Sequence, residues 1–450
     1  MNKNSKIFVL CYPHLGTLDS WLPVVNSINA IASHTNFTLV IPNATIIRSF
    51  HRDNAVVKIA NNIFDTVLIH AYDDTWIRHT SIFDSMKWYK NNRIILRLFD
   101  ILNRLIKKKL FFYILNWPFI LFRNKLYKKE YRAGIKEFNR NAPQTDILFY
   151  DIHDECILAV QEILDFFGNN RYSLPHAISL ATIEQKSPVP VDIKNKININ
   201  IYAYAKFQIE FYRAKYGINA NKIHVVGIPR HDYNWIKTIQ EESPKLPDPF
   251  DNDNTVVILS LPIFTSNSDV VFNQKVETIK NIKKIFIDKL DMRIAIKLHP
   301  NEKQGKIFAG RGDRIYENVF GLKNYGLTWI YSDLHIFALA KGKKLTISLK
   351  TGVVFDMIAM SVPCIEHVDL SIESKNSEKY EKKLTQFVKY GFVEGASNYK
   401  ELCACVDRWL SNPNQISKSS ISAYKKYFPV SNDVSRKVAT EILHKNEIIN

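Results

Sequence analysis

Short apolar runs that alternate with helical segments are the feature that most constrains how this chain can fold. Near the start, we expect strands at residues 6–12, 37–41 and 66–70, with helices at about 19–33 and 43–51. Two parallel neighbouring strands need a long crossover connection, which is usually a helix, so this alternation is typical of a parallel sheet covered by helices. The sequence therefore predicts the α/β class.

The alternation runs in two series, and a polar, proline-rich segment at 241–254 separates them. This composition predicts a linker. Later strands are expected at 146–150, 198–203, 224–226, 256–261, 293–296, 327–331, 345–348 and 363–366. Because 450 residues suit two domains of ordinary size, we expect Rossmann-like domains at 1–240 and 255–415. Terminal helices over 416–450 are expected to pack back on the N-terminal domain.

The expected strand at 293–296 runs directly into Lys297, Leu298, His299 and Pro300. Proline ends a strand, because it cannot donate a hydrogen bond to the next strand and its φ is fixed. In open α/β sheets, ligands bind at the C-terminal ends of the strands. A lysine and a histidine at such an end suit the phosphates of an anionic ligand. The alternative is that His299 only caps a loop.

Lys350, Thr351 and Gly352 stand between the expected strand at 345–348 and a helix. At a helix N-terminus, free amide groups, a hydroxyl and the helix dipole favour phosphate. The alternative is that Thr351 and Gly352 only cap the helix. Since both strands are expected in one sheet, we predict that these residues form one anion site together with Lys297 and His299.

A further cation, Arg230, lies in a turn that runs from Gly227 to Asp232. Glycine and proline fix the backbone of this turn. A guanidinium group binds phosphate with two parallel hydrogen bonds, so we expect Arg230 to reach an anion across a cleft.

Carboxylates and imidazoles follow several strands of the first series. Asp151 directly follows the expected strand at 146–150, and His176 lies in an extended segment at 174–178. His14 follows the first strand. Side chains at strand ends can reach into a cleft, and their pKa values can be tuned for proton transfer. We therefore predict that the general base is His176, Asp151 or His14, in that order; the alternative for Asp151 is a helix cap.

The chain has no pattern for a metal, a redox cofactor or a disulfide framework. Its five cysteines are scattered without zinc-ligand spacing, and we expect them to be reduced. The glycine fingerprint of nicotinamide and flavin enzymes is missing after the first strand. The first apolar run is too short for a signal peptide, and no window reaches the ~18 apolar residues of a spanning helix. We expect a cytoplasmic protein without metal or cofactor.

The formal net charge of +17 indicates an anionic partner, and basic residues gather in the segment 85–140. Aromatic residues are interleaved there, and its central apolar run at 110–122 contains Asn116 and Pro118. This run is too short to cross a bilayer, but a basic amphipathic helix can lie on an anionic membrane surface. The segment predicts a helical insertion with that role. The alternatives are an insertion that packs on the core, or a nucleic-acid surface, which no recognised motif supports.

Three motifs, in order, resemble those of bacterial surface-polysaccharide transferases with two facing Rossmann-like domains, the GT-B architecture. Residues 227–232 (GIPRHD) are similar to their GNPR-aromatic-D turn, and residues 297–300 (KLHP) to their KxHP motif. Residues 351–356 (TGVVFD), followed by Pro363, resemble SSxxFD…P, with Gly352 in place of the second serine. The groups that the chain resembles are capsule Kdo transferases, HP-motif sialyl- and polysialyltransferases, and CDP-glycerol glycerophosphotransferases.

The resemblance covers about residues 145–370, where residues 175–177 (PHA) are also similar to a PHG motif. It implies a glycosyltransferase of capsule or other cell-surface polysaccharide synthesis, peripheral on the inner face of the cell membrane. The resemblance further implies a cytidine-nucleotide-activated sugar as donor, CMP-Kdo or a CMP-nonulosonic acid, and an acceptor that is lipid-linked or a polysaccharide. The implied donor-binding residues are Lys297, His299, Pro300, Lys350, Thr351, Gly352 and Arg230.

Three other functions fit the same sequence. The first is a polyol-phosphate transferase that uses CDP-glycerol or CDP-ribitol. The second is an isomerase similar to UDP-GlcNAc 2-epimerase, which shares the architecture and needs no acceptor. The third is an inactive scaffold that is tethered to the membrane through residues 85–140. It is favoured by Gly352, which lacks the hydroxyl of the family's second serine, and by the absence of the acidic base motif of the sialyltransferases.

Overall fold

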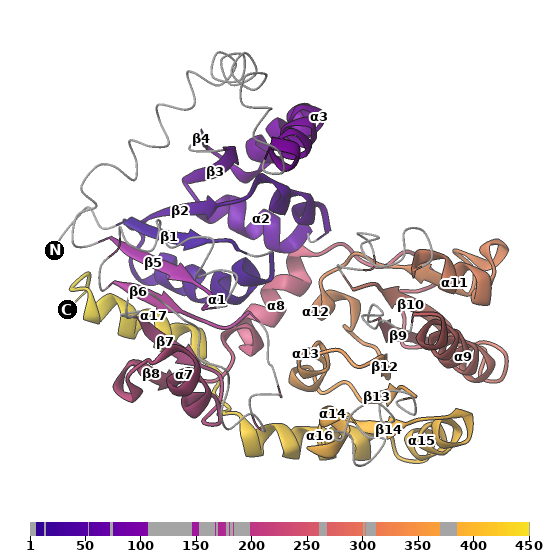
Figure 1. Cartoon of the computed structure of the whole chain (residues 1–450). Coiled ribbons are helices and arrows are strands. Elements are labelled where there is room, and N and C mark those ends of the chain that lie inside the picture. Colours follow the sequence, from indigo (N-terminus) through magenta and orange to yellow (C-terminus); the bar gives the residue numbers. More distant parts are fainter. Residues whose placement is uncertain are drawn as a thin grey trace. The chain divides into compact units, whose positions relative to one another are not determined.

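The computed structural model of the chain describes residues 6–12, 15–52, 54–72, 75–106, 146–152, 167, 170–176, 180, 183, 199–260, 268–299, 302, 312–369 and 385–449. The chain divides into two compact units, each with its own sheet (Figure 1). Unit 1 comprises residues 1–177, 186–232 and 431–450, and unit 2 comprises residues 178–185 and 233–430.

The sheet of unit 1 has the strand order β4-β3-β2-β1-β5-β6-β7-β8. Its strands are β1 (Lys6–Leu10), β2 (Asn36–Ile41), β3 (Thr66–Tyr72), β4 (Thr75–His79), β5 (Ile147–Tyr150), β6 (Arg171–Ser173), β7 (Asn200–Ala203) and β8 (Ile223–Val225). All neighbours are parallel except β3 and β4, which are antiparallel. The first strand, β1, lies between β2 and β5, which is the order of a Rossmann-like sheet.

The helices of unit 1 are α1 (Leu15–Ile31), η1 (Ala44–Arg52), α2 (Asn54–Ile63), α3 (Ile82–Ile106), α7 (Gln208–Tyr216), η3 (Ala220–Lys222), η4 (Pro229–His231) and α17 (Val434–Lys445). The helix predicted at 43–51 is the 3₁₀ helix η1. Of the predicted insertion at 85–140, the part up to residue 106 belongs to α3, and residues 107–140 lie outside the described residues.

The sheet of unit 2 has the order β11-β10-β9-β12-β13-β14, and all its neighbours are parallel. Its strands are β9 (Thr255–Leu259), β10 (Arg293–Lys297), β11 (Trp329–Tyr331), β12 (Thr346–Ser348), β13 (Cys364–His367) and β14 (Glu394–Ala396). The first strand of this unit, β9, again lies between the second and the fourth. The predicted α/β class with two Rossmann-like domains is confirmed.

The helices of unit 2 are α8 (Tyr233–Glu242), α9 (Ser268–Phe286), α11 (Gly312–Phe320), η5 (Leu322–Asn324), α12 (Ile336–Leu339), α13 (Val354–Ala359), α14 (Gln386–Lys389), α15 (Tyr399–Ser411) and α16 (Pro413–Tyr427). The segment 241–254, predicted as a linker, lies within unit 2. Lys343 Nζ holds it there by donating to the main-chain oxygens of Phe250 (2.8 Å) and Asn252 (2.7 Å). Of the predicted terminal helices, residues 416–430 belong to unit 2 and residues 431–450 to unit 1.

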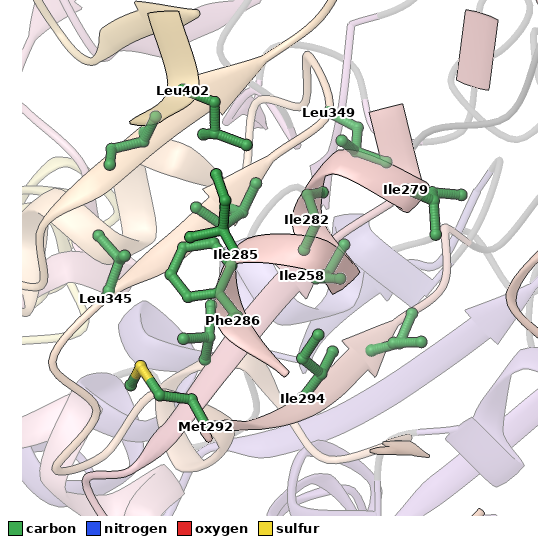
Figure 2. Close-up of a cluster of buried hydrophobic side chains, with 14 of the residues drawn as sticks. Ile258, Ile279, Ile282, Ile285, Phe286, Met292, Ile294, Leu345, Leu349 and Leu402 are labelled. Carbon is green, nitrogen blue, oxygen red and sulfur yellow. The ribbon is translucent and has the colours of Figure 1, made fainter. Parts of the chain in front are cut away.

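The core of unit 2 shows why its polar residues gather at strand ends. Ile279, Ile282 and Phe286 recur at helical spacing on α9 and are fully buried in one cluster with Ile258 of β9 and Ile294 of β10 (Figure 2). The opposite face of β9 is buried as well, as is usual for a strand in the middle of a parallel sheet. With both faces filled by apolar side chains, the ends of the strands are the places left for chemistry.

Asp232, the last residue of the GIPRHD turn, fixes the start of α17. Its Oδ1 accepts from the main-chain N–H of Val434 (3.0 Å), and its Oδ2 accepts from that of Ser435 (2.7 Å). Ser435 Oγ in turn donates to the main-chain oxygen of Pro229 (3.1 Å). A carboxylate at a helix N-terminus satisfies N–H groups that have no partner within the helix. Asp232 therefore ties α17 to unit 1, where α17 packs against α1 (Figure 1).

We expect Asp232→Ala to lower the free energy of unfolding by about 1.5–3 kcal/mol, because buried N–H groups lose a charged acceptor. Urea unfolding followed by circular dichroism measures the loss. Asp433→Ala is the matched control, since Asp433 is exposed and its side chain makes no cap bond to α17. Its effect should stay within about 0.5 kcal/mol. Equal losses in the two variants would contradict the role assigned to Asp232.

Candidate functional site

The register of unit 2 brings the loops after three strands to one edge. Lys297 of β10 and Ser348 of β12 are both aligned with Leu259 of β9. The loops also bond to these strands: Ser260 N–H donates to the Lys297 oxygen (3.1 Å), and Leu349 N–H donates to the Leu259 oxygen (3.0 Å). The strand order changes direction at β9, and such a switch point is where open α/β sheets bind ligands.

His299 lies in a tight turn at this edge, and Glu302 closes the turn. His299 N–H donates to Glu302 Oε2 (3.0 Å), and Glu302 N–H donates to the His299 oxygen (3.0 Å). The Glu302 carboxylate is buried, and it also accepts from Ser260 Oγ (2.8 Å) and pairs with Lys275. The sequence interpretation missed Glu302, although a glutamate three residues after His299 stands where the glutamate of a capping box would be. Pro300 lies outside the described residues.

Lys297 contributes to the neighbouring loop as well as to the charge of the edge. Its Nζ donates to the main-chain oxygen of Leu334, which follows β11. A lysine ammonium carries three N–H donors and a compact positive charge. Lys297 therefore links the ends of β10 and β11 and places a cation beside the His299 turn.

The loop after β12 uses its polar groups to form the start of α13. Lys350 has a left-handed φ of 65°, and Thr351 N–H donates to Ser348 Oγ (3.3 Å). Thr351 is buried, and its Oγ1 accepts from Val353 N–H (3.5 Å). Gly352 is exposed. This contact lies in the turn before α13, whose cap residue Val353 has no side-chain cap bond. Phosphate binding by Lys350, Thr351 and Gly352 stays a prediction.

Glu366, in the strand β13 at the same edge of the sheet, is a buried acid that the sequence interpretation missed. It lies near the end of β13, aligned with Ser348 of β12. Thr385 Oγ1 donates to its Oε1, and its Oε2 has no hydrogen-bond partner among the described residues. Burial raises the pKa of Glu366 to about 7, although the Thr385 bond and the Lys350 cation oppose the shift. A glutamate within an apolar strand was the only sign of it in the sequence.

In unit 1, neighbouring strands bring two of the three predicted bases together. Asp151 follows β5 and His176 follows β6, and these strands are parallel neighbours. Asp151 Oδ2 contacts His176 Nδ1; Asp151 is buried, while 21% of the His176 side chain is exposed. A carboxylate at Nδ1 orients the ring and leaves Nε2 to accept a proton. His14 lies outside the described residues.

Two further contacts of unit 1 involve residues near or after these strands. Tyr204, which follows β7, donates its hydroxyl to the main-chain oxygen of Pro175, next to His176. Burial raises the pKa of Tyr204, so the hydroxyl keeps its proton and the bond persists. Arg230 lies in unit 1, where its Nη1 is 3.0 Å from Asp19 Oδ2 of α1. Donor binding by Arg230 stays a prediction.

Among the described residues, no group of three or more histidines, cysteines, aspartates or glutamates could hold a metal ion. No helix in the described ranges is long and apolar enough to cross a membrane.

No protein-family model matches the sequence, and no curated protein matches it. Solved structures do share its fold. A putative UDP-N-acetylglucosamine 2-epimerase from Listeria monocytogenes is 12% identical, covers 99% of this chain and 97% of its own, and has a TM-score of 0.54. The wall teichoic acid polymerase TagF with CDPG is 10% identical over 100% of this chain and 90% of its own, with a TM-score of 0.54.

A third similar structure is the S. aureus MnaA–UDP co-structure, which is 11% identical over 99% of this chain and 98% of its own, with a TM-score of 0.51. At these identities the likeness establishes the fold alone. The chain has the GT-B-like fold of two Rossmann-like domains, as predicted.

We expect the stability of the protein to fall as the pH rises through the range in which Glu366 ionises. Its pKa is about 7 in the folded state, whereas the usual value of 4.5 applies to the unfolded chain. At a pH between these two values unfolding releases a proton, so unfolding becomes easier as the pH rises. Below about pH 4.5 this penalty is absent, and above about pH 7 it is complete.

Glu366→Gln should remove the penalty and stabilise the protein relative to wild type by up to about 3 kcal/mol at pH 8, but much less at pH 5. Urea unfolding at both pH values measures the difference. Glu277→Gln, on the exposed surface of α9, is the control. A difference for Glu366→Gln that is the same at pH 5 and pH 8 would show that the acid does not ionise as described.

Proposed function

We propose that the protein is a nucleotide-dependent glycosyltransferase and that the C-terminal edge of the unit 2 sheet binds the nucleotide of the donor. The observation that carries this proposal is the register that aligns Lys297 and Ser348 with Leu259. It brings the loop with His299 and the loop with Thr351 to either side of the central strand. A cation, an imidazole and the amides of two loops at a switch point are suited to phosphate groups.

The donor that we propose is a cytidine-nucleotide-activated sugar, CMP-Kdo or a CMP-nonulosonic acid. The support is the resemblance of residues 297–300 and 351–356 to the motifs of cell-surface polysaccharide transferases. During transfer, the bond between the sugar and the phosphate oxygen breaks, and the electron pair stays on the phosphate. Lys297, His299 and Thr351 would stabilise this growing negative charge more strongly in the transition state than in the bound donor.

The proton of the acceptor hydroxyl goes, in this proposal, to Nε2 of His176. The support is the contact between His176 Nδ1 and the buried Asp151 carboxylate. A carboxylate in that position stabilises the imidazolium that forms when the ring takes the proton. The acceptor oxygen then forms the new bond to the sugar. A lipid-linked or polysaccharide acceptor follows from the family resemblance.

An isomerase similar to UDP-GlcNAc 2-epimerase is the second candidate. It is favoured by the likeness in fold over almost the whole of both chains to the Listeria monocytogenes structure. Such an enzyme converts its nucleotide sugar without any acceptor. Incubation of the protein with a nucleotide sugar alone therefore distinguishes the two functions: conversion favours the isomerase, and a requirement for an acceptor favours the transferase.

We expect CMP and CDP to raise the melting temperature more than UDP does, because a ligand that binds only the folded state stabilises it. His299→Ala should weaken this binding at least tenfold, since a hydrogen bond to a charged group contributes about 1.5–3 kcal/mol. His176→Ala is the matched histidine variant in unit 1. It should keep the nucleotide stabilisation and lower turnover by about 10²–10⁴.

Thermal shift with each nucleotide and an assay of sugar transfer measure these effects. Equal stabilisation by uridine and cytidine nucleotides would contradict the cytidine donor. Unchanged stabilisation of His299→Ala would contradict the nucleotide site, and normal turnover by His176→Ala would remove it as the base.

We further propose that the protein lies on the anionic inner face of the cell membrane through the segment 85–140 and the start of α3. Phe83, Lys87, Lys90 and Ile94 recur on α3 at intervals of four, three and four residues, which places them on one side of the helix. All four are exposed, Phe83 by 50% and Ile94 by 69%. Exposed apolar and basic side chains in one stripe suit the surface of an anionic bilayer.

The wild type should float with phosphatidylserine vesicles at low salt and come off at high salt, because attraction of about 1 kcal/mol per lysine is screened by ions. Lys87→Glu combined with Lys90→Glu should abolish flotation. Lys400→Glu combined with Lys418→Glu changes the net charge equally on exposed sites of unit 2 and should float normally. Failure of the wild type to float at low salt would overturn the membrane role.

A further inference from the structure

The turn that carries His299 is held by a buried cluster of charged and polar groups from four parts of unit 2. Glu302 Oε1 pairs with Lys275 Nζ of α9 and accepts from Ser260 Oγ (2.8 Å), which directly follows β9. Lys275 Nζ also donates to Ser260 Oγ (3.2 Å), and Ser260 Oγ contacts the hydroxyl of Tyr316 on α11. The side chains of Lys275 and Glu302 are 9% and 2% exposed.

A contribution to stability does not account well for this pair. Two buried charges lose their hydration, and apolar residues of similar size are often as stable in their place. The geometry offers another reason. β10 ends at Lys297, and the N–H of His299, two residues further on, donates to Glu302 Oε2 at 3.0 Å. The other oxygen of that carboxylate is fixed by Lys275 and Ser260.

We propose that Glu302 and Lys275 are positioning residues for His299. They tie its main chain to β9, α9 and α11, so that the imidazole meets the donor phosphate without rearrangement of the turn. This inference rests on the proposed role of His299 in nucleotide binding. Donor groups that must be reorganised before they act lose much of their effect, which is why supporting contacts of this kind matter.

The test compares two double variants with the wild type. Lys275→Met with Glu302→Leu removes both charges and the acceptor of the His299 N–H. Lys275→Met with Glu302→Gln also removes both charges, but it keeps a carbonyl oxygen as the acceptor. Neither leaves a buried charge without its partner, so we expect both to fold; Glu302→Leu should melt lower than Glu302→Gln, because it also removes the acceptor of the His299 N–H. If the pair only stabilised the fold, the two double variants would show the same CMP affinity.

The measurements are hydrogen exchange of the His299 amide and the affinity for CMP by calorimetry. With Glu302→Leu, exchange should be at least tenfold faster and CMP affinity about tenfold lower. With Glu302→Gln, the exchange rate and the CMP affinity should both lie close to the wild-type values. Lys343→Met is the control for a lost buried lysine elsewhere in unit 2; it should melt at a lower temperature and keep the exchange rate and the affinity.

Unchanged exchange of the His299 amide in the Glu302→Leu variant would overturn the positioning role, whether or not CMP binds. Faster exchange with unchanged CMP affinity would overturn it as well, because the fixed turn would then have no effect on the site. Absence of CMP binding by the wild type would contradict the proposed cytidine donor instead, and the exchange rates would still decide the role of Glu302 and Lys275.

Discussion

Parallel pairing of β9 with β10 on one side and β12 on the other is the interaction on which the unit 2 site depends. Parallel hydrogen bonding brings the C-terminal ends of all three strands to one edge. The faces of the sheet are closed by apolar side chains such as Ile258 and those of α9 (Figure 2). Polar groups can therefore act at the edge, and the register decides which of them are neighbours.

This dependence explains how much could be predicted from the sequence. Strands buried on both faces appear as continuous apolar runs, so β9 and β10 were predictable from their own residues. β4 and β6 were not predicted, whereas β8, β11 and β12, which are also short, were. β4 pairs antiparallel with β3, and β6 has three residues without an apolar run, so the neighbours that these two segments find decide their structure more than their own pattern does.

In the candidate site, single residues could be predicted from the sequence, but contacts between distant segments could not. Lys297 and His299 were recognisable because a proline follows them at the end of a strand. Asp151 and His176 were recognisable as residues, but their contact depends on β5 and β6 being neighbours, which no local pattern indicates. The pairing of Arg230 with Asp19 was also beyond reach, since it joins segments far apart in the chain.

Each unit uses a buried carboxylate to support a histidine, but the two carboxylates contact different atoms. Asp151 contacts a ring nitrogen of His176 and so determines the tautomer and orientation of the imidazole, which is what proton transfer requires. Glu302 contacts the main-chain N–H of His299 and so determines the position of the turn rather than the protonation of the ring. A histidine that binds phosphate needs a fixed location and a ring that can donate. The difference between the two contacts is what the proposed base in unit 1 and the proposed donor-binding histidine in unit 2 would each require.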